Sequence, residues 1–211
     1  PNYLLERYVP GGIFHVDSIV YEREVRFAVA SGYGRPPLDV SHHGGVFTTR
    51  LLERGSEREQ LLLEMNRHLL AALGLVRGVS HTEFIIGHDG TVYFLETAAR
   101  VGGAHIAELV EAATGINLWA EWARIEVAGG KKDYHVPAAR MDYAGLLVSL
   151  ARQDHPDTSG YTDAEIVWRM DKANHVGFIV RSDSHAVVEM KLGELTERVT
   201  RDFWAYAPPK E

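Results

Sequence analysis

Two predicted strands, 82–86 and 91–96, flank the tetrapeptide GHDG at 87–90, and this pattern constrains the fold more than any other feature of the chain. An Asp-Gly step supplies the positive backbone φ that a tight turn between antiparallel strands requires. The sequence therefore predicts a β-hairpin, with one glutamate on each of its strands, Glu83 and Glu96.

The register of this hairpin decides whether the two acids meet. If the loop has two or four residues, Glu96 lies opposite His81, and Glu83 is its diagonal neighbour on the same face. Diagonal neighbours lie about 7–8 Å apart, within reach of two glutamates that share an ion. Two carboxylates about 5 Å apart repel by roughly 3 kcal/mol at an effective dielectric near 20, and Mg²⁺ would reverse that repulsion. The alternative for Glu83 and Glu96 is that both are solvated acids of edge strands. His81 could lie beside the site, and the alternative is a histidine on the surface.

A base and two glycines follow the second acid in the segment FLETAARVGG, residues 94–103. The guanidinium of Arg100 can hold a phosphoryl or acyl oxygen, since arginine suits planar oxyanions. Gly102 and Gly103 precede a predicted helix, where bare backbone amides can approach an anion. A salt bridge from Arg100 to Glu96 and a tight turn are the alternative. Together these residues suggest a site where metal, phosphate and a carboxylate-bearing substrate meet.

The rest of the chain alternates between strand and helix patterns. Ser56 and Glu59 form a capping box for a helix with an apolar stripe, which ends before Gly74. The other predicted strands are 3–9, 13–21, 25–30, 145–151, 165–170 and 176–181, and the other predicted helices are 104–113, 118–128, 184–190 and 193–203. We expect two units, 1–130 and 131–211, because the glycine pair at 129–130 and the polar stretch after it suit a boundary.

The segment 31–49 is predicted to be a long loop, and loops of this length are usually functional or disordered. It carries the adjacent histidines His42 and His43, one of which could recognise the substrate or deprotonate an incoming amine. A polar mobile loop without a function is the alternative.

Bulk composition excludes several function classes. The formal net charge is −7 and no Lys/Arg cluster offsets it, which argues against a nucleic-acid surface. No apolar run approaches the roughly 20 residues of a membrane span. The absence of cysteine fits a cytoplasmic location. Since the sequence begins at Pro1 without a methionine, we expect it to be a segment of a longer polypeptide.

The motifs HTEF, with Glu83, and FLETAARVGG, with Glu96 and Arg100, resemble the C-terminal half of an ATP-grasp ligase. The resemblance implies an α+β fold: a nucleotide- and metal-binding lobe with a largely antiparallel sheet flanked by helices, and a small α+β C-terminal subdomain. It also implies ATP and Mg²⁺, or Mn²⁺, as cofactors. Glu83 and Glu96 would hold the metal, Arg100 would be catalytic, and Gly102 and Gly103 would receive the substrate carboxylate.

The start of the chain, YLLERYVPGGIFHVDSIV, resembles the hinge that takes adenine and the strand after it. By this resemblance, Glu6, Tyr8 and Val9 line the adenine pocket, and His15 and Asp17 face the ribose and phosphates. Strand alternation independently puts His15 and Asp17 on one face.

Within the superfamily, the pattern E-x-A-A-R with HTE upstream is most similar to the L-amino-acid ligases and related carboxylate–amine ligases. Ala98 stands where biotin carboxylases carry an asparagine metal ligand. The resemblance implies that a carboxylate attacks ATP to give an acyl phosphate, and that an amine then forms the amide.

The expected partners are small-molecule carboxylates and amines, and a second copy in a homodimer. Alternatives are an ATP-grasp carboxylase or another non-peptide ligase, and a nucleotide-binding module without catalysis. The family's glycine-rich phosphate loop and its lysines would precede Pro1, so this segment alone is expected to be inactive.

Overall fold

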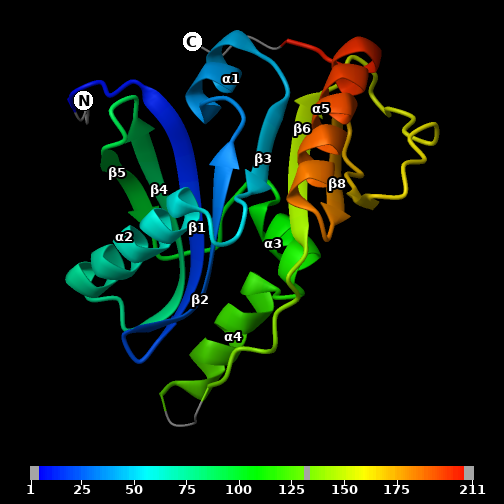
Figure 1. Ribbon diagram of the computed structural model, residues 1–211. Helices are drawn as coiled ribbons and strands as arrows, with labels where there is room; N and C mark the ends of the chain where they lie inside the picture. Colours follow the sequence, from blue (N-terminus) through cyan, green and yellow to red (C-terminus); the bar gives the residue numbers. More distant parts are fainter. Residues whose placement is uncertain (1–4, 131–133, 207–211) are drawn as a thin grey trace.

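The computed structural model describes residues 5–130 and 134–206, and Figure 1 shows their arrangement. The strands are β1 (Gly11–Tyr21), β2 (Glu24–Tyr33), β3 (Phe47–Leu51), β4 (Arg77–Gly87), β5 (Val92–Ala98), β6 (Tyr143–Leu150), β7 (Ile166–Arg169) and β8 (His175–Ser182). The helices are α1 (Pro37–His43), α2 (Glu57–Leu73), α3 (Ile106–Thr114), α4 (Leu118–Ala128) and α5 (His185–Asp202).

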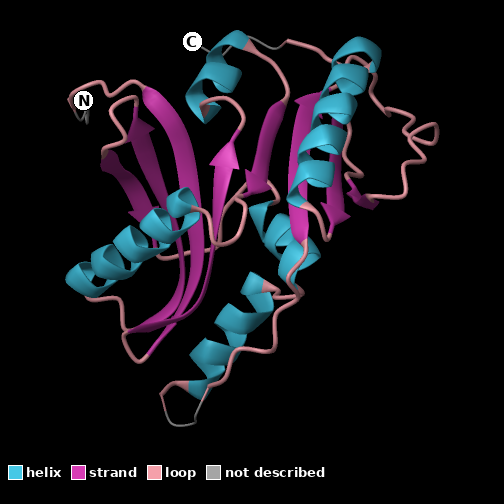
Figure 2. Cartoon of the chain, in the orientation of Figure 1, coloured by secondary structure: helices cyan, strands magenta, loops and turns pink. Residues whose placement is uncertain are grey.

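All eight strands belong to one sheet with the order β5-β4-β1-β2-β3-β6-β8-β7. Every neighbouring pair is antiparallel. Figure 2 shows this sheet twisting through the molecule with helices packed against it. The predicted α+β fold, a largely antiparallel sheet flanked by helices, is confirmed.

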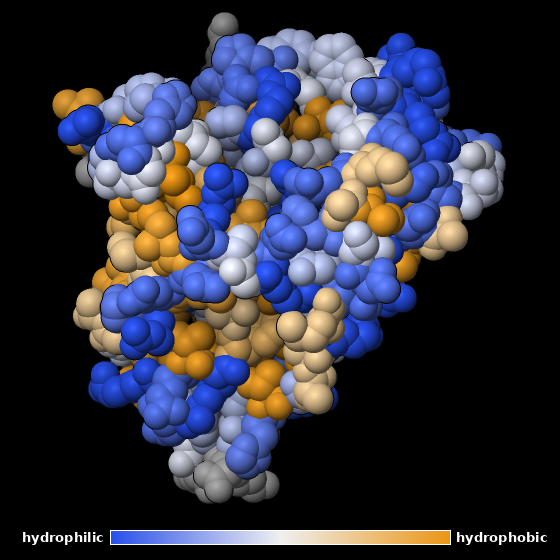
Figure 3. Space-filling view, viewed as in Figure 1, coloured by the Kyte–Doolittle hydropathy of each residue, from blue (hydrophilic) through white to orange (hydrophobic). Residues whose placement is uncertain are grey.

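The helices cover both faces of the sheet because successive side chains of each strand point to opposite sides. On one face, Val16 of β1 packs with Leu62 of α2, and Leu147 of β6 packs with Leu195 of α5. On the other face, Ile19 of β1 lies in a cluster that includes residues of α3 and α4. Figure 1 shows α2 and α5 on one side and α3 and α4 on the other, and Figure 3 shows that the outer surface of α5 is mostly hydrophilic.

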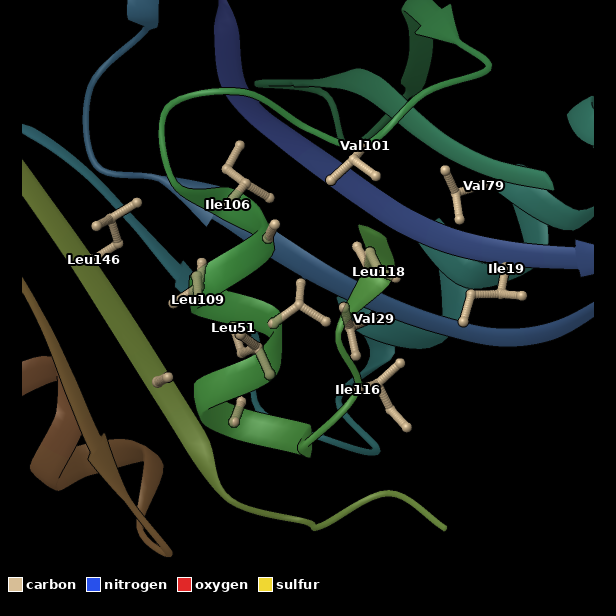
Figure 4. Close-up of a cluster of buried hydrophobic side chains, with 14 of the residues drawn as sticks. Ile19, Val29, Leu51, Val79, Val101, Ile106, Leu109, Ile116, Leu118 and Leu146 are labelled. Atoms are coloured by element: carbon tan, nitrogen blue, oxygen red, sulfur yellow. The ribbon is translucent and has the colours of Figure 1, made fainter. Parts of the chain in front are cut away.

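The largest buried cluster lies between the sheet and α3. Figure 4 shows Leu109 of α3 among side chains from several strands, including Val29 and Leu146. Val101, the residue after Arg100, belongs to the same cluster and is 2% exposed. Burial of a valine or leucine side chain contributes about 1.5–3 kcal/mol, so this contact fixes the loop that follows β5 against the sheet.

The ends of α2 follow the predicted signals. The Ser56 Oγ accepts a hydrogen bond from the backbone N–H of Glu59 at 3.2 Å. The Glu59 carboxylate accepts from the N–H of Gly55 at 2.6 Å, one residue earlier than a standard capping box. Gly74 ends the helix in the left-handed conformation with φ 75°.

The structure differs from the predicted elements in three places. The described part of the strand predicted over 3–9, residues 5–9, forms no strand. The segment 31–49, predicted as a loop, contains the end of β2, all of α1 and most of β3. The two helices predicted over 184–190 and 193–203 are one helix, α5, because its buried stripe continues past Gly193 and a glycine inside a helix costs only about 1 kcal/mol.

The chain after residue 134 adds β6, β7 and β8 to the sheet that β1 to β5 begin. The division into 1–130 and 131–211 stays a prediction, and residues 131–133 lie outside the described residues. Over the described ranges, no helix combines the length and the apolar character that crossing a membrane would need.

Candidate functional site

The two predicted metal ligands form a direct cross-strand pair. Glu83 of β4 lies opposite Glu96 of β5, and we call these two residues the acidic pair. The predicted register is wrong, since His81 lies opposite Ala98 and not opposite Glu96. Directly opposed residues have Cβ atoms about 4.5–5.5 Å apart, so the two carboxylates are closer neighbours than the predicted diagonal arrangement would make them.

A β-bulge creates this pairing. Near the turn Ile86 pairs with Val92, and a register shift between Glu83 and Phe84 leaves Leu95 without a partner on β4. Without the bulge, Glu83 would lie opposite Leu95 and Glu96 would point to the other face of the sheet. Bulges often re-aim side chains beside functional sites, and this one brings both acids to the same face.

Each member of the acidic pair keeps oxygen atoms available. Tyr33 donates its hydroxyl to Oε1 of Glu83 at 2.6 Å, and Nε2 of His81 lies 3.4 Å from that same oxygen. Among the described residues, Oε2 of Glu83 and the exposed carboxylate of Glu96 have no hydrogen-bond or ion-pair partner. Two adjacent acids with free hard oxygen atoms fit a divalent cation such as Mg²⁺ or Mn²⁺.

Behind the acidic pair lies a buried network of four side chains: His15, Asp17, Thr49 and His81. Asp17 accepts from Nδ1 of His15 at 2.7 Å through one oxygen and from Nδ1 of His81 at 2.8 Å through the other. Nε2 of His15 lies 2.7 Å from the Thr49 hydroxyl. None of the four residues is more than 6% exposed.

Charge in the network favours a protonated His81 beside an ionised Asp17. Burial by itself would raise the pKa of Asp17, but His15 and His81 outweigh it and lower this pKa to about 2. Burial would lower the pKa of His81, but its bonds to Asp17 and Glu83 raise this pKa to about 9. At neutral pH the His81 imidazolium can therefore donate to Asp17 and toward Glu83 together.

The pKa values of Glu83 and of its partner Tyr33 shift in opposite directions. Burial would raise the pKa of Glu83, but the bonds from His81 and Tyr33 lower it, so Glu83 is ionised at neutral pH. Burial and the bond to Glu83 raise the pKa of Tyr33, so its phenol remains a donor. Tyr33 and His81 thus stabilise the ionised form of Glu83.

Arg100 lies in the loop after β5, the strand that carries Glu96. It is exposed, and its Nη1 donates to the backbone carbonyl of Val101 at 2.9 Å. Over the described ranges Arg100 forms no ion pair with Glu96. The structure therefore does not contain the salt bridge that was the alternative. Its role toward a phosphoryl or acyl oxygen stays a prediction.

The two glycines after Arg100 differ in their surroundings. A Cβ at Gly102 would lie 2.9 Å from Nδ1 of His81 and 3.0 Å from Oδ1 of Asp17, so any other residue there would crowd the buried network. Gly103 is exposed, and a Cβ there would meet nothing within 4 Å. The predicted contact of both glycines with a substrate carboxylate stays a prediction.

An unusual backbone turn leads from these glycines into α3. Ala104 has φ 49° and His105 has φ 66°, a left-handed conformation that is uncommon for residues other than glycine. The ring of His105 lies 4.7 Å from that of Trp168 in β7, and its Nδ1 lies 3.3 Å from Glu108. The loop between β5 and α3, residues 99–105, is called the Arg100 loop, and this contact joins it to β7, the strand at the opposite edge of the sheet.

The residues predicted to contact ATP occupy different environments. Glu6 and Tyr8 are exposed and Val9 is half-buried in the segment before β1. His15 and Asp17 share a face of β1, as predicted, but both are completely buried and bond to each other. All five contacts with nucleotide stay predictions, and the ring of the buried His15 lies 4.8 Å from that of Tyr33 and 5.2 Å from that of His81.

The two histidines predicted for the substrate lie in the last turn of α1 and are exposed. Nδ1 of His43 lies 2.8 Å from Asp39, and the carbonyl of His42 accepts from Tyr206 at 2.9 Å. None of these bonds leads to the acidic pair, and their substrate role stays a prediction.

Sequence reasoning missed Tyr33 and Thr49, which both fall in the segment predicted as a loop. The alternation of β2 runs from Phe27 through Ser31 to Tyr33, and extending it would have placed Tyr33 on the face of the acidic pair. Thr49 has no local signal, because β3 is recognisable only by its pairing with β2 and β6.

No protein-family model matches this chain, but a curated protein and several solved structures are similar to it. The L-arginine-specific L-amino acid ligase of Bacillus subtilis is 28% identical over 115 residues, which cover 54% of this chain and 27% of the relative. The crystal structure of an L-amino acid ligase from Bacillus licheniformis has a TM-score of 0.67 at 15% identity. That match covers 96% of this chain and 55% of the ligase.

A second solved structure extends the likeness beyond the amino-acid ligases. Carboxyaminoimidazole ribonucleotide synthase from Aspergillus clavatus, complexed with ATP, has a TM-score of 0.67 at 12% identity. The match covers 93% of this chain and 52% of the synthase, so the chain spans about half the length of these enzymes. The chain has the fold of the C-terminal part of an ATP-grasp ligase, and in sequence it resembles an L-amino acid ligase.

Proposed function

We propose that this chain is the C-terminal part of an ATP-dependent carboxylate–amine ligase, which forms an amide through an acyl phosphate. The observation that carries this proposal is the acidic pair, whose free oxygens lie on one face of adjacent strands. The sequence likeness to an L-arginine-specific L-amino acid ligase supports amino acids as the substrate class.

In this proposal the acidic pair holds Mg²⁺, or Mn²⁺, against the phosphates of ATP. A bound divalent cation neutralises charge on the phosphate oxygens during phosphoryl transfer. Arg100 stabilises negative charge on the acyl phosphate and on the tetrahedral species that the amine forms from it. The backbone amides of Gly102 and Gly103 receive the substrate carboxylate.

The remaining contacts come from the start of the chain and from α1. The segment with Glu6, Tyr8 and Val9 lines the adenine pocket, and the His15–Asp17 side of β1 lies toward the ribose and phosphates. His42 or His43 recognises the substrate or accepts a proton from the amine. We further propose that the protein is cytoplasmic, acts on small-molecule substrates and forms homodimers. It has no nucleic-acid or membrane partner in this proposal.

Trapping of the acyl phosphate tests this proposal in the complete protein. With ATP, Mg²⁺ and a set of amino acids, added hydroxylamine should intercept the acyl phosphate and give a hydroxamate together with ADP. Glu96→Gln should abolish both products, because one metal ligand is lost. Formation of ADP without any hydroxamate, for every amino acid supplied, would contradict the ligase proposal.

An ATP-grasp carboxylase is the second candidate, because the fold matches a carboxyaminoimidazole ribonucleotide synthase as well as it matches an L-amino acid ligase. ATP cleavage that depends on bicarbonate would favour it. A nucleotide-binding module without catalysis is less well supported, since Glu83, Glu96 and Arg100 are all present.

A further inference from the structure

The acidic pair is asymmetric in its surroundings. Glu96 lies exposed on β5, an edge strand, whereas the Glu83 side chain is 15% exposed and one of its oxygens has two neighbours. Oε1 accepts from the Tyr33 hydroxyl at 2.6 Å and faces Nε2 of His81 at 3.4 Å. Oε2 has no partner among the described residues.

We propose that Tyr33 and His81 are positioning residues of this site, which hold Glu83 by Oε1 so that Oε2 stays free for the divalent cation. The inference deepens the proposed function and rests on it. A glutamate side chain has three rotatable bonds, and two donors on one oxygen restrict its rotation. Loss of a partner that orients a metal ligand typically lowers metal affinity or activity about 10- to 100-fold.

His81 is itself held from behind. Its Nδ1 donates to Asp17, which accepts from His15 through its second oxygen, and His15 contacts Thr49. Every link in this chain of contacts is on a strand of the sheet, so the support comes from rigid elements and not from a loop. His81 therefore cannot rotate away from Glu83 without breaking a bond to Asp17.

The same three residues, His15, Asp17 and His81, place potential ligand atoms within 4.8 Å of one another. Both oxygens of Asp17 are already occupied by imidazole nitrogens at 2.7 and 2.8 Å. A cation would have to break both bonds in a site that is at most 6% exposed. The cluster therefore serves as support for Glu83 and not as a second metal centre.

The support extends to the Arg100 loop. The backbone at Gly102 approaches His81 and Asp17 so closely that a Cβ there would lie 2.9 Å and 3.0 Å from their polar atoms. One buried pair thus fixes the metal ligand Glu83 on one side and the loop that carries Arg100 on the other. Alignment of these two groups is what phosphoryl transfer requires.

Binding of Mn²⁺ with ADP to the complete protein tests the inference, with free Mn²⁺ measured by electron paramagnetic resonance. Tyr33→Phe keeps the ring and removes the donor, and should weaken Mn²⁺ binding about 10- to 100-fold. Tyr161→Phe is the matched control, because Tyr161 donates to Asp202 at 2.9 Å in a different cluster. It should leave Mn²⁺ affinity unchanged, and both variants should retain their melting temperature within a few degrees.

Two substitutions at His81 separate positioning from general stability. In His81→Asn, the amide can replace Nδ1 toward Asp17 but nothing reaches Glu83, so Mn²⁺ affinity should fall about 10-fold or more. In His81→Gln, the amide reaches the Nε2 position and should restore part of that affinity. A structural role alone would give no such rescue, because both variants remove the imidazole.

The outcomes distinguish a failure of the proposed function from a failure of the positioning role alone. If the wild-type protein fails to bind Mn²⁺ with ADP, or Glu96→Gln binds it equally well, the proposed function fails and the positioning role fails with it. If the wild type binds and Glu96→Gln does not, but Tyr33→Phe and His81→Asn bind like the wild type, only the positioning role is overturned.

Discussion

Gly102→Ala is the substitution whose effect the structure defines most sharply. The new methyl group would lie 2.9 Å from Nδ1 of His81 and 3.0 Å from both Oδ1 of Asp17 and Cγ2 of Ile106. An ordinary van der Waals contact begins near 3.4 Å, so three buried neighbours would have to give by a few tenths of an ångström. Closely packed interiors accommodate such changes poorly.

The expected loss of stability in Gly102→Ala depends on how the clash is relieved, and there are two ways. Overpacking of a buried site typically costs about 1–3 kcal/mol. Lengthening the bond between Asp17 and His81 would forfeit a hydrogen bond to a charged group, with a net contribution of about 1.5–3 kcal/mol. We therefore expect Gly102→Ala to lower the unfolding free energy by about 2 kcal/mol. For a domain of this size that corresponds to a fall in melting temperature of roughly 4–8 °C.

Gly103→Ala is the matched control, because a Cβ at that position meets nothing within 4 Å. Its unfolding free energy should stay within about 0.5 kcal/mol of the wild type. Urea unfolding followed by circular dichroism measures both variants. Equal stability of Gly102→Ala and wild type, or equal loss in both variants, would refute the claim that the loop rests on the buried network.

Three further predictions concern stability. The folded-state pKa of Asp17, about 2, lies below its ordinary value of 3.8. The ionised carboxylate therefore contributes roughly 2 kcal/mol to the free energy of unfolding above pH 3.8, and this contribution is lost as the pH falls through 2. In urea unfolding curves measured at a series of pH values, Asp17→Asn should reduce the loss of stability in acid. Ser56→Ala removes the N-cap of α2 and should cost about 1 kcal/mol by urea unfolding, whereas no loss would mean that the cap bond is unimportant. Leu62 is fully buried, so Leu62→Ala should lower the free energy of unfolding by about 2–5 kcal/mol, measured by thermal unfolding. Leu61 is 39% exposed, and Leu61→Ala should cost less than about 1 kcal/mol. Equal losses in the two variants would contradict the packing described for α2.

Local signals predicted elements well where they are strong. Helix α4 has the predicted bounds Leu118–Ala128, and α2 has its caps at the predicted residues, Ser56 and Gly74. Caps and left-handed glycines act within a few residues, so the sequence alone contains them. The five-residue strand β3 was missed because its stability comes from pairing with β2 and with β6, which begins almost a hundred residues later.

The acidic pair was predicted on one face by reasoning whose register was wrong. The turn differs by one residue from the predicted register, and the bulge at Leu95 shifts the pairing again. The two shifts together return Glu83 and Glu96 to the same face. A bulge has no reliable sequence signal, because it depends on how both strands fit the sheet as a whole.

The buried network could be predicted only in part. Strand alternation put His15 and Asp17 on one face, but their partner His81 lies on β4, 64 residues from Asp17 along the chain. Only the sheet order β4-β1-β2 brings His81 and Tyr33 to either side of β1. Tertiary packing thus decides which donors support Glu83.

ADP release by the complete protein tests the central claim, that the acidic pair is the metal site of an ATP-dependent ligase. With ATP, Mg²⁺ and a carboxylate–amine substrate pair, Glu83→Gln and Glu96→Gln should each abolish ADP release while the melting temperature stays close to that of the wild type. Glu64→Gln, at an exposed acid of α2, is the control and should leave the rate unchanged. Turnover retained by either variant of the acidic pair would contradict the account.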